Sequence, residues 1–233
     1  MKKIMWAIAC LSLIGTAVAI SFLPDQIPVH YDIAGNVNRV GSKYECLIFP
    51  VLIIVMAMFT TIQIGKFEKK AEGASDEKEA AAAGTNARVI GIVGILTTVV
   101  FTGIEGVLLY NALRSGTDPQ DRFFHLGKVI LILVGALFIL LGGLMTKSRR
   151  NSSFGIRTRW SLYNDNTWEK SNRFGAFAMM IAGLLVILAA IFMQNVTLIG
   201  LVILGAAFLM TIATVWYSRK VYLQETGKED ASR

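Results

Sequence analysis

The chain has 233 residues, of which 54% are hydrophobic and only 17% are charged, and its formal net charge is +7. Soluble domains average about 25% charged residues, and a bilayer crossing needs about 20 consecutive apolar ones. Six apolar runs exclude a soluble fold, and their unbroken character excludes the alternating strands of a β-barrel. The runs are Ile4–Leu23, Leu47–Gly65, Val89–Leu113, Leu126–Thr146, Phe174–Phe192 and Val196–Tyr217. The predicted fold is all-α, a polytopic membrane protein with six transmembrane helices.

The first run resembles a secretory signal peptide, because Lys2 and Lys3 precede an apolar stretch and Ala17-Val18-Ala19 imitates a cleavage site. The apolar stretch nevertheless continues to Leu23, which gives about a full bilayer crossing. We therefore expect a retained first helix.

Basic residues are divided unequally between alternate segments outside the runs. Eighteen of the 23 Lys and Arg residues lie in the N-terminal tail, in Lys66–Arg88, in Lys147–Arg173 and in the C-terminal tail, whereas Pro24–Cys46 and Arg114–His125 together hold four. Positive residues stay on the cytoplasmic side, so the prediction is N-in and C-in. The basic charge is thus a topology signal, and no direct nucleic-acid partner is expected.

The outer segment Pro24–Cys46 is predicted to form a short folded cap. Pro24 and Pro28 restrict the backbone, Ile27–Ile33 alternates as a short strand would, and Gly35-Asn36 is a turn signal. The cap is either a structural plug over the first two helices or a surface that recognises something outside the cell.

Two further segments carry simpler expectations. Cys10 and Cys46 fall near opposite ends of their helices, more than about 15 Å apart in depth, which is too far for a disulfide, so two free thiols are predicted. The cytoplasmic segment Gly65–Arg88 is rich in Lys, Glu and Ala, which favour helix. It is either a short surface helix broken near Gly73 or a solvated linker.

Glu105 is the only acidic residue deep in a predicted span. A charged group there costs about 2.5–3.5 kcal/mol or more, so Glu105 is expected to be protonated, paired or facing a polar cavity. The candidate partners are Asn111, Lys128 or a residue of the outer cap. The alternatives are an interhelical hydrogen bond and an outward-facing polar pocket.

Metal and catalytic chemistry have little support. His30 and His125 lie on the outer side among scattered acids (Asp25, Asp32, Asp118 and Asp121), whereas a metal site needs three or four ligands in fixed geometry. The motifs of zinc proteases, serine hydrolases and P-loop proteins are absent from the sequence. We expect no metal, no cofactor and no enzyme.

The cytoplasmic segment Asn151–Arg173 is longer and more aromatic than a turn requires. Its arginines can make forked contacts to carboxylate or phosphate. Trp160 and Trp168 suit a membrane interface with their N–H groups in water, and Asn164 or Asp165 could cap a short helix through Arg173. The segment is either a lipid-facing anchor or a surface that binds a protein.

Both loops resemble known bacterial sequences. The outer loop resembles the signature of a small two-helix membrane domain of unknown function, through Pro24, Ile27, Pro28, His30, Gly35, Gly41, Ser42 and Lys43. The inner loop resembles the signature of the SdpI family of membrane immunity proteins, through Phe154, Gly155, Ile156, Arg157, Thr158, Trp160, Asn164, Trp168, Asn172 and Arg173. Arg159 and Asn172 depart from the residues common in that family, Pro and His.

The resemblance implies a multi-pass protein of the bacterial cytoplasmic membrane that gives immunity to a secreted peptide or protein toxin. It also implies signalling, in which a cytoplasmic helix-turn-helix repressor is held at the membrane. The expected domains are a two-helix unit over 1–66, a linker over 67–88, a four-helix unit over 89–217 and a tail over 218–233. The rival functions are a small transporter or efflux component that uses Glu105, and, without motif support, an intramembrane enzyme.

Overall fold

The computed structural model describes residues 1–31, 37–114, 119–194 and 196–231. Within them are six helices that are long and apolar enough to cross a membrane, which confirms the prediction of six spans. The helices are α1 (Lys2–Ile20), α2 (Ile48–Glu72), α3 (Glu77–Leu113), α4 (Pro119–Met145), α5 (Asp165–Phe192) and α6 (Val196–Ala231).

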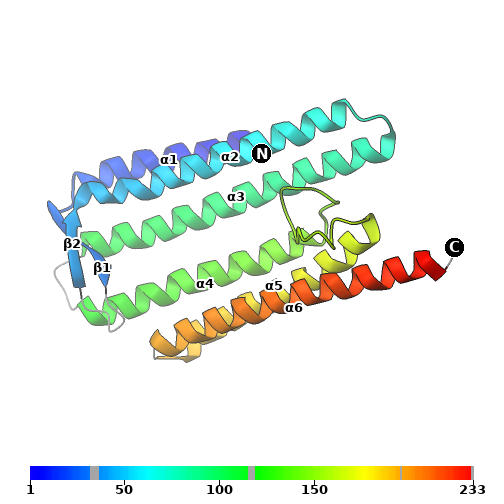
Figure 1. The fold of residues 1–233 in the computed structure, drawn as a ribbon. Coiled ribbons are helices and arrows are strands. Elements are labelled where there is room, and N and C mark those ends of the chain that lie inside the picture. Colours follow the sequence, from blue (N-terminus) through cyan, green and yellow to red (C-terminus); the bar gives the residue numbers. More distant parts are fainter. Residues whose placement is uncertain (32–36, 115–118, 195, 232–233) are drawn as a thin grey trace.

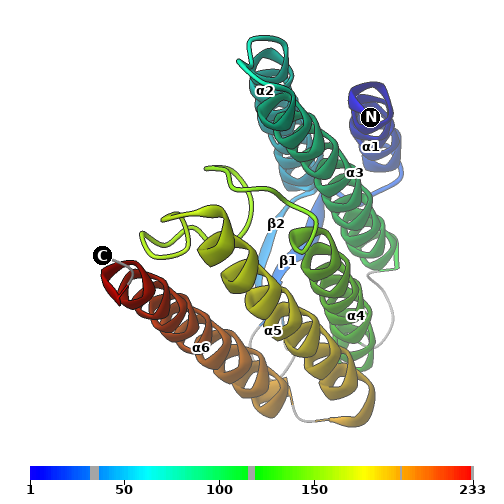
Figure 2. The same ribbon diagram turned by 90° about the vertical axis from the view of Figure 1, so that its right-hand side faces the viewer.

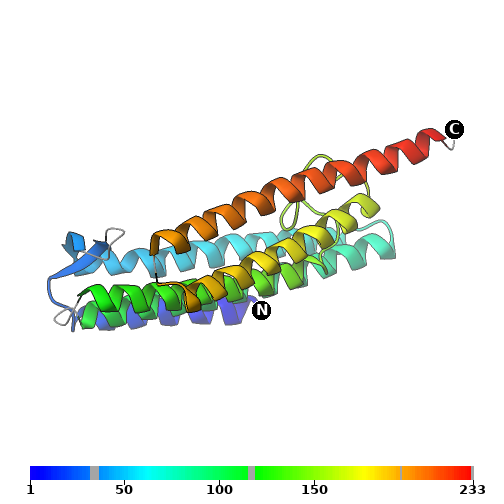
Figure 3. The ribbon, with the colours of Figure 1, turned by 90° about the horizontal axis from the view of Figure 1, so that it is seen from below.

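The helices run side by side along one long axis (Figure 1), and successive helices reverse direction. A small β-hairpin lies at one end, beside the start of α4, and the loop between α4 and α5 lies at the other end (Figures 1 and 3). Figure 2 shows α3, α4, α5 and α6 following one another, with α1 and α2 beside α3. Helix α6 therefore lies at the edge of the bundle, where it packs against α5 and leaves many apolar side chains exposed.

Helices α2 and α3 continue well past their apolar runs and turn over residues 73–76. Gly73 ends α2, and Asp76 caps α3 by accepting a hydrogen bond from the Glu79 amide at 2.7 Å. Lys70 pairs with Glu79 across the turn at 3.3 Å. The break near Gly73 is confirmed, but most of the expected linker is helical extension rather than a separate surface helix.

Helices α4 and α5 approach each other closely where two glycines face across the interface. A Cβ on Gly135 would lie 2.7 Å from the Gly183 carbonyl oxygen, and one on Gly183 would lie 2.5 Å from the Gly135 oxygen. Small residues allow this approach, and the resulting dispersion contacts drive helix association in lipid. Close backbone approach at these glycines thus holds α4 and α5 together.

The outer segment folds as an antiparallel hairpin of β1 (Gln26–Tyr31) and β2 (Val37–Ser42), followed by the short 3-10 helix η1 (Lys43–Leu47). Strand β1 falls in the predicted strand region. Strand β2 was not predicted, because polar residues interrupt its short apolar pattern. The predicted turn residues Gly35 and Asn36 lie outside the described residues.

Candidate functional site

The β-hairpin is fixed to the helices through its first strand and its two ends. Ile27 is 3% exposed and packs with Leu23 and Ala112. Lys43 Nζ lies 2.9 Å from Asp25 Oδ1, and the Lys43 amide donates to the Asp25 carbonyl oxygen at 3.1 Å. Burial of the Ile27 side chain contributes about 1.5–3 kcal/mol, so the hairpin is a fixed cover over the ends of α1 and α3.

Glu105 lies beneath this cover and is 3% exposed. Its Oε2 accepts a hydrogen bond from Ser12 Oγ and its Oε1 accepts one from Thr16 Oγ1, each at 2.5 Å. Ser12 and Thr16 are four residues apart and so share one face of α1. The carboxyl group is therefore satisfied by two neutral donors from a single helix face.

Glu105 forms interhelical hydrogen bonds, which were one of the two alternatives, but the donors are not among the candidates named from the sequence. Both donors, Ser12 and Thr16, belong to α1. The available signal was the pair of hydroxyl residues, Ser12 and Thr16, at i and i+4 within an otherwise apolar run. A helix buries such a pair against a polar group because unpaired hydroxyls in a bilayer are costly.

Two hollows meet at Glu105. The first is a cavity of about 230 Å³ under the hairpin. We call it the cap cavity, and its lining residues come from β1, η1, α2 and α3: Ile27, Pro28, Val29, Glu45, Cys46, Ile48, Phe49, Glu105, Leu108, Leu109, Asn111 and Ala112. The second, of about 290 Å³, is a groove between α1 and α3 lined by Ile8, Leu11, Ser12, Gly15, Thr16, Thr102, Glu105, Gly106 and Leu109. Glu105 is the one ionisable side chain that lines both.

Some of the outer-loop residues singled out from the sequence line the cap cavity, and others are exposed. Ile27 and Pro28 line the cap cavity, whereas Pro24 and His30 are exposed. His30 Nδ1 lies 2.6 Å from Asn38 Oδ1 on the opposite strand. Lys43 closes the base of the hairpin, and Gly35 lies outside the described residues.

Metal-binding groups do not gather in this region. Among the described residues no three His, Cys, Asp or Glu side chains are placed to hold an ion. The side chains of His125, Asp32, Asp118 and Asp121 lie outside the described part of the chain. Cys46 lines the cap cavity, and Cys46 and Cys10 are free thiols, as predicted.

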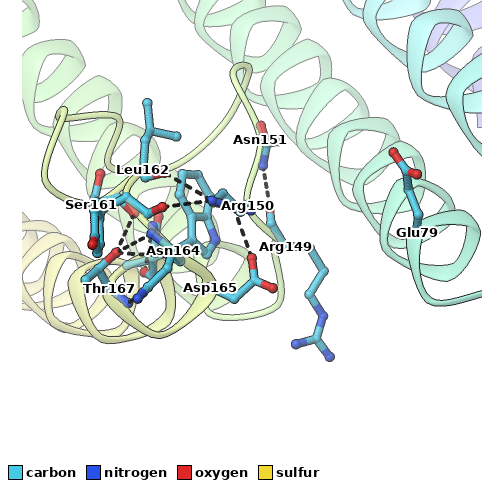
Figure 4. A network of polar contacts seen from close by, with 12 residues as sticks. Glu79, Arg149, Arg150, Asn151, Ser161, Leu162, Asn164, Asp165 and Thr167 are labelled. Atoms are coloured by element: carbon cyan, nitrogen blue, oxygen red, sulfur yellow. Dashed lines mark hydrogen bonds and ion pairs between the residues drawn. The ribbon is translucent and has the colours of Figure 1, made fainter. Parts of the chain in front are cut away.

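The inner loop ends at a capped helix start. Asn164 Oδ1 accepts a hydrogen bond from the Thr167 amide at 2.8 Å, and Thr167 Oγ1 accepts one from the Asn164 amide at 3.0 Å, forming a capping box. Asn164 is thus confirmed as the cap, although the helix it begins is the whole of α5 rather than a short separate one. Arg150 braces the same corner, since its Nε lies 3.0 Å from Asp165 Oδ1 and its guanidinium donates to the Leu162 carbonyl oxygen at 3.2 Å (Figure 4).

Trp168 and Asn172 are buried at the centre of the loop, and the half-buried Gly155 lies against them. Gly155 has a φ of +114°, and a Cβ there would lie 2.2 Å from Asn172 Oδ1. That oxygen accepts a hydrogen bond from the Ile156 amide at 2.8 Å. Trp168 is 2% exposed and donates its indole N–H to the Ser148 carbonyl oxygen at 3.0 Å. The expectation that Trp168 lies at the lipid interface with a wet N–H was therefore wrong.

Thr158 has a structural role in the next turn of the loop. Its amide donates to Ser161 Oγ and its Oγ1 accepts from the Ser161 amide, both at 3.0 Å. Ser161 is completely buried and also donates to the Ile156 carbonyl oxygen at 2.6 Å. These contacts satisfy backbone groups that a loop would otherwise leave unpaired.

Four of the predicted loop residues are turned outward instead. Arg157, Arg159 and Arg173 are exposed, and Trp160 is partly exposed. The Arg159 guanidinium lies over the Trp160 ring at 5.0 Å, and Arg157 donates to the Ser152 carbonyl oxygen at 2.7 Å while remaining accessible. These four residues, which we call the basic face, are accessible for contact with another molecule.

The loop also joins the two halves of the chain. The Arg149 amide donates to Asn86 Oδ1 of α3 at 2.9 Å, and Gln63 Nε2 of α2 donates to Ser153 Oγ at 2.8 Å. Phe154 packs against the cluster that contains Ile64, Phe67, Ala87 and Ile90. Gln63 and Asn86 were not singled out from the sequence, and the only signal was that they are polar residues beside apolar runs.

The fold and the loops define a multi-pass helical membrane protein with a capped cavity at one end and a folded polar loop at the other. Residues 147–218 match the family described as the SdpI/YfhL protein family, and residues 7–54 match a domain of unknown function, DUF1648. The first of these matched regions contains the inner loop and the second contains the outer loop, so both extend the resemblance beyond the loops themselves.

Two curated proteins of Bacillus subtilis (strain 168) are similar to the chain. One is named Immunity protein SdpI, which is 22% identical over 229 residues, covering 95% of this chain and 98% of the relative. The other is the uncharacterised protein YfhL, which is 26% identical over 106 residues, covering 43% of this chain and 96% of the relative. No solved structure matches.

Proposed function

We propose that this protein is a non-enzymatic immunity protein of the bacterial cytoplasmic membrane that gives resistance to a secreted killing toxin. The observation that carries the proposal is the similarity to Immunity protein SdpI along 95% of the chain. Further support comes from the match of residues 147–218 to the SdpI/YfhL family. A rigid cap over a partly apolar cavity also suits recognition of a peptide that arrives from outside.

The proposal assigns the two ends of the molecule different tasks. The predicted N-in orientation puts the hairpin and the cap cavity outside, where a secreted toxin arrives, and Pro28 and Glu105 line that cavity. The inner loop lies on the cytoplasmic side, where the basic face is available to a cytoplasmic helix-turn-helix repressor or to anionic lipid. Holding such a repressor at the membrane is the signalling part of the proposal.

Expression in a toxin-sensitive host tests the proposal. A toxin-sensitive bacterial strain would carry this chain and be exposed to the killing toxin to which it is sensitive. Survival above the empty-vector control is expected, and survival equal to that control, with the protein detected in the membrane fraction, would count against immunity. Reporter fusions after Gly41 and Gly155 test the orientation, because alkaline phosphatase is active only outside.

A transporter that uses Glu105 is the second candidate, because Glu105 reaches both the cap cavity and the groove between α1 and α3. Proton-coupled uptake by liposomes containing the purified protein, abolished by Glu105→Gln, would favour it. Absence of any uptake together with conferred survival would favour immunity.

A further inference from the structure

The cap cavity contains one buried carboxyl group whose partners are all neutral. Glu105 is 3% exposed. Within the described part of the chain its hydrogen-bond donors are Ser12 and Thr16, and no ion pair joins it to a basic side chain. A buried carboxylate without a countercharge is costly. The cavity therefore offers a cation a favourable position beside a carboxylate already fixed by two donors.

Glu45, the second acidic residue that lines the cavity, differs from Glu105 in having a basic partner. Glu45 lines the cavity but forms an ion pair with Arg39 of β2. Its charge is partly compensated, whereas no basic side chain in the described part of the chain pairs with Glu105. A cation that enters the cavity consequently finds its strongest attraction at Glu105.

The volume and the lining of the cavity limit the size and polarity of the group that carries the positive charge. Ligand pockets for drug-sized molecules hold about 300 Å³ or more, whereas this cavity holds about 230 Å³. Most of its lining is aliphatic or aromatic, including Val29, Phe49 and Leu109. One flexible aliphatic chain fits this description better than a compact inorganic ion, which would keep its water in polar surroundings.

We propose that the cap cavity binds a primary ammonium group carried on a short aliphatic chain, as in a lysine side chain, with Glu105 as the counterion. The chain lies against the apolar walls under the hairpin and the ammonium group donates to the carboxylate. This site is a property of the cavity alone and does not depend on an immunity role. If both hold, a lysine of the toxin is the group that enters.

The groove between α1 and α3 is the competing location, since it also reaches Glu105. Apart from Glu105, its polar lining consists of the hydroxyls of Ser12, Thr16 and Thr102. The cap cavity adds a second carboxylate, Glu45, whose charge Arg39 compensates only in part, so its lining keeps the more negative character. That difference favours the cavity for a cation.

Calorimetric titration of the purified full-length protein in nanodiscs tests the site with hexylammonium as probe, and hexanol and hexanoate as controls of equal chain length. Saturable binding is expected for hexylammonium and not for the two controls at the same concentration. Glu105→Gln is expected to weaken hexylammonium binding about tenfold or more, since a charge-assisted contact is lost. Glu68→Gln, the same change in an exposed acid at the other end, is expected to leave binding unchanged.

Two filling variants separate the hollows and keep the test decisive if Glu105→Gln does not fold. Val29→Phe fills the cap cavity from the hairpin and is expected to abolish binding. Gly106→Leu fills the groove, where nothing lies within 4 Å of an added Cβ, and is expected to leave binding intact. Equal binding of hexylammonium and hexanol, unchanged binding in Val29→Phe, or loss of binding in Gly106→Leu would each overturn the assignment.

Discussion

Replacing Gly155 with alanine should destabilise the inner loop by an amount that the structure allows one to work out. Gly155 has a φ of +114°, where a side chain costs about 1–3 kcal/mol. The new Cβ would also lie 2.2 Å from Asn172 Oδ1. Displacing that oxygen leaves the Ile156 amide unpaired at a cost of about 1–3 kcal/mol.

The backbone strain and the lost hydrogen bond together lower the free energy of unfolding by about 2–6 kcal/mol. For a chain of this size each kcal/mol lowers the melting temperature by about 2–4 °C, so Gly155→Ala should melt at least about 4 °C below wild type. Fluorescence-detected size-exclusion chromatography after heating in detergent measures this difference. Gly143→Ala in α4 is the matched control, because nothing lies within 4 Å of its added Cβ, and no drop is expected.

The clash and the hydrogen bond share the Asn172 side chain, so the two substitutions should not be additive. In an Asn172→Ala background the steric part of the Gly155→Ala effect should largely vanish. A Gly155→Ala protein with the same melting temperature as the Gly143→Ala control would refute the reasoning. So would full additivity of Gly155→Ala and Asn172→Ala.

Three further outcomes are expected. Trp168→Phe removes the buried indole N–H and leaves the Ser148 carbonyl oxygen unpaired, so melting temperature should fall by the equivalent of about 1–3 kcal/mol; an unchanged value would contradict this role. Ile27→Ala should free the hairpin from its anchor at a cost of about 2–5 kcal/mol, seen as faster amide exchange confined to β1 and β2, and unchanged exchange would argue against anchoring. Arg157→Gln should leave melting temperature within about 1 °C, since the residue is exposed, while weakening pull-down of a co-expressed repressor; a large loss of stability would make Arg157 structural.

Hydropathy and charge predict the spans because the bilayer imposes length and composition on them. The helix ends were less predictable. The Lys- and Glu-rich segment Gly65–Arg88 has no lipid to shape its sequence, so its composition did not indicate that Lys70 and Glu79 would pair across a helical hairpin. The early start of α5 rests on the Asn164 capping box, which was recognised as a cap but not as the cap of the whole span.

The candidate sites depend on contacts between distant segments, which no local pattern shows. The partners of Glu105 are Ser12 and Thr16, which lie 93 and 89 residues away along the chain. Trp168 looked like an interfacial residue because tryptophan is common there, yet the loop folds over it. Likewise Asn172, a departure from the residue common in the resembling family, accepts the hydrogen bond that positions Ile156.

The two ends of the molecule are physically connected through α3. This one helix carries Glu105 beneath the hairpin and Asn86 at the inner loop, nineteen residues apart, which is about 28 Å of helix. Asn86 accepts the Arg149 amide, and Arg149 opens the loop that presents the basic face. A ligand that displaces Glu105 from Ser12 and Thr16 would therefore act on the element against which the inner loop rests. The two ends are coupled only if α3 has two arrangements whose contacts with the ligand and with the inner loop differ. The contacts that would differ are those in the cap cavity and the Asn86 hydrogen bond.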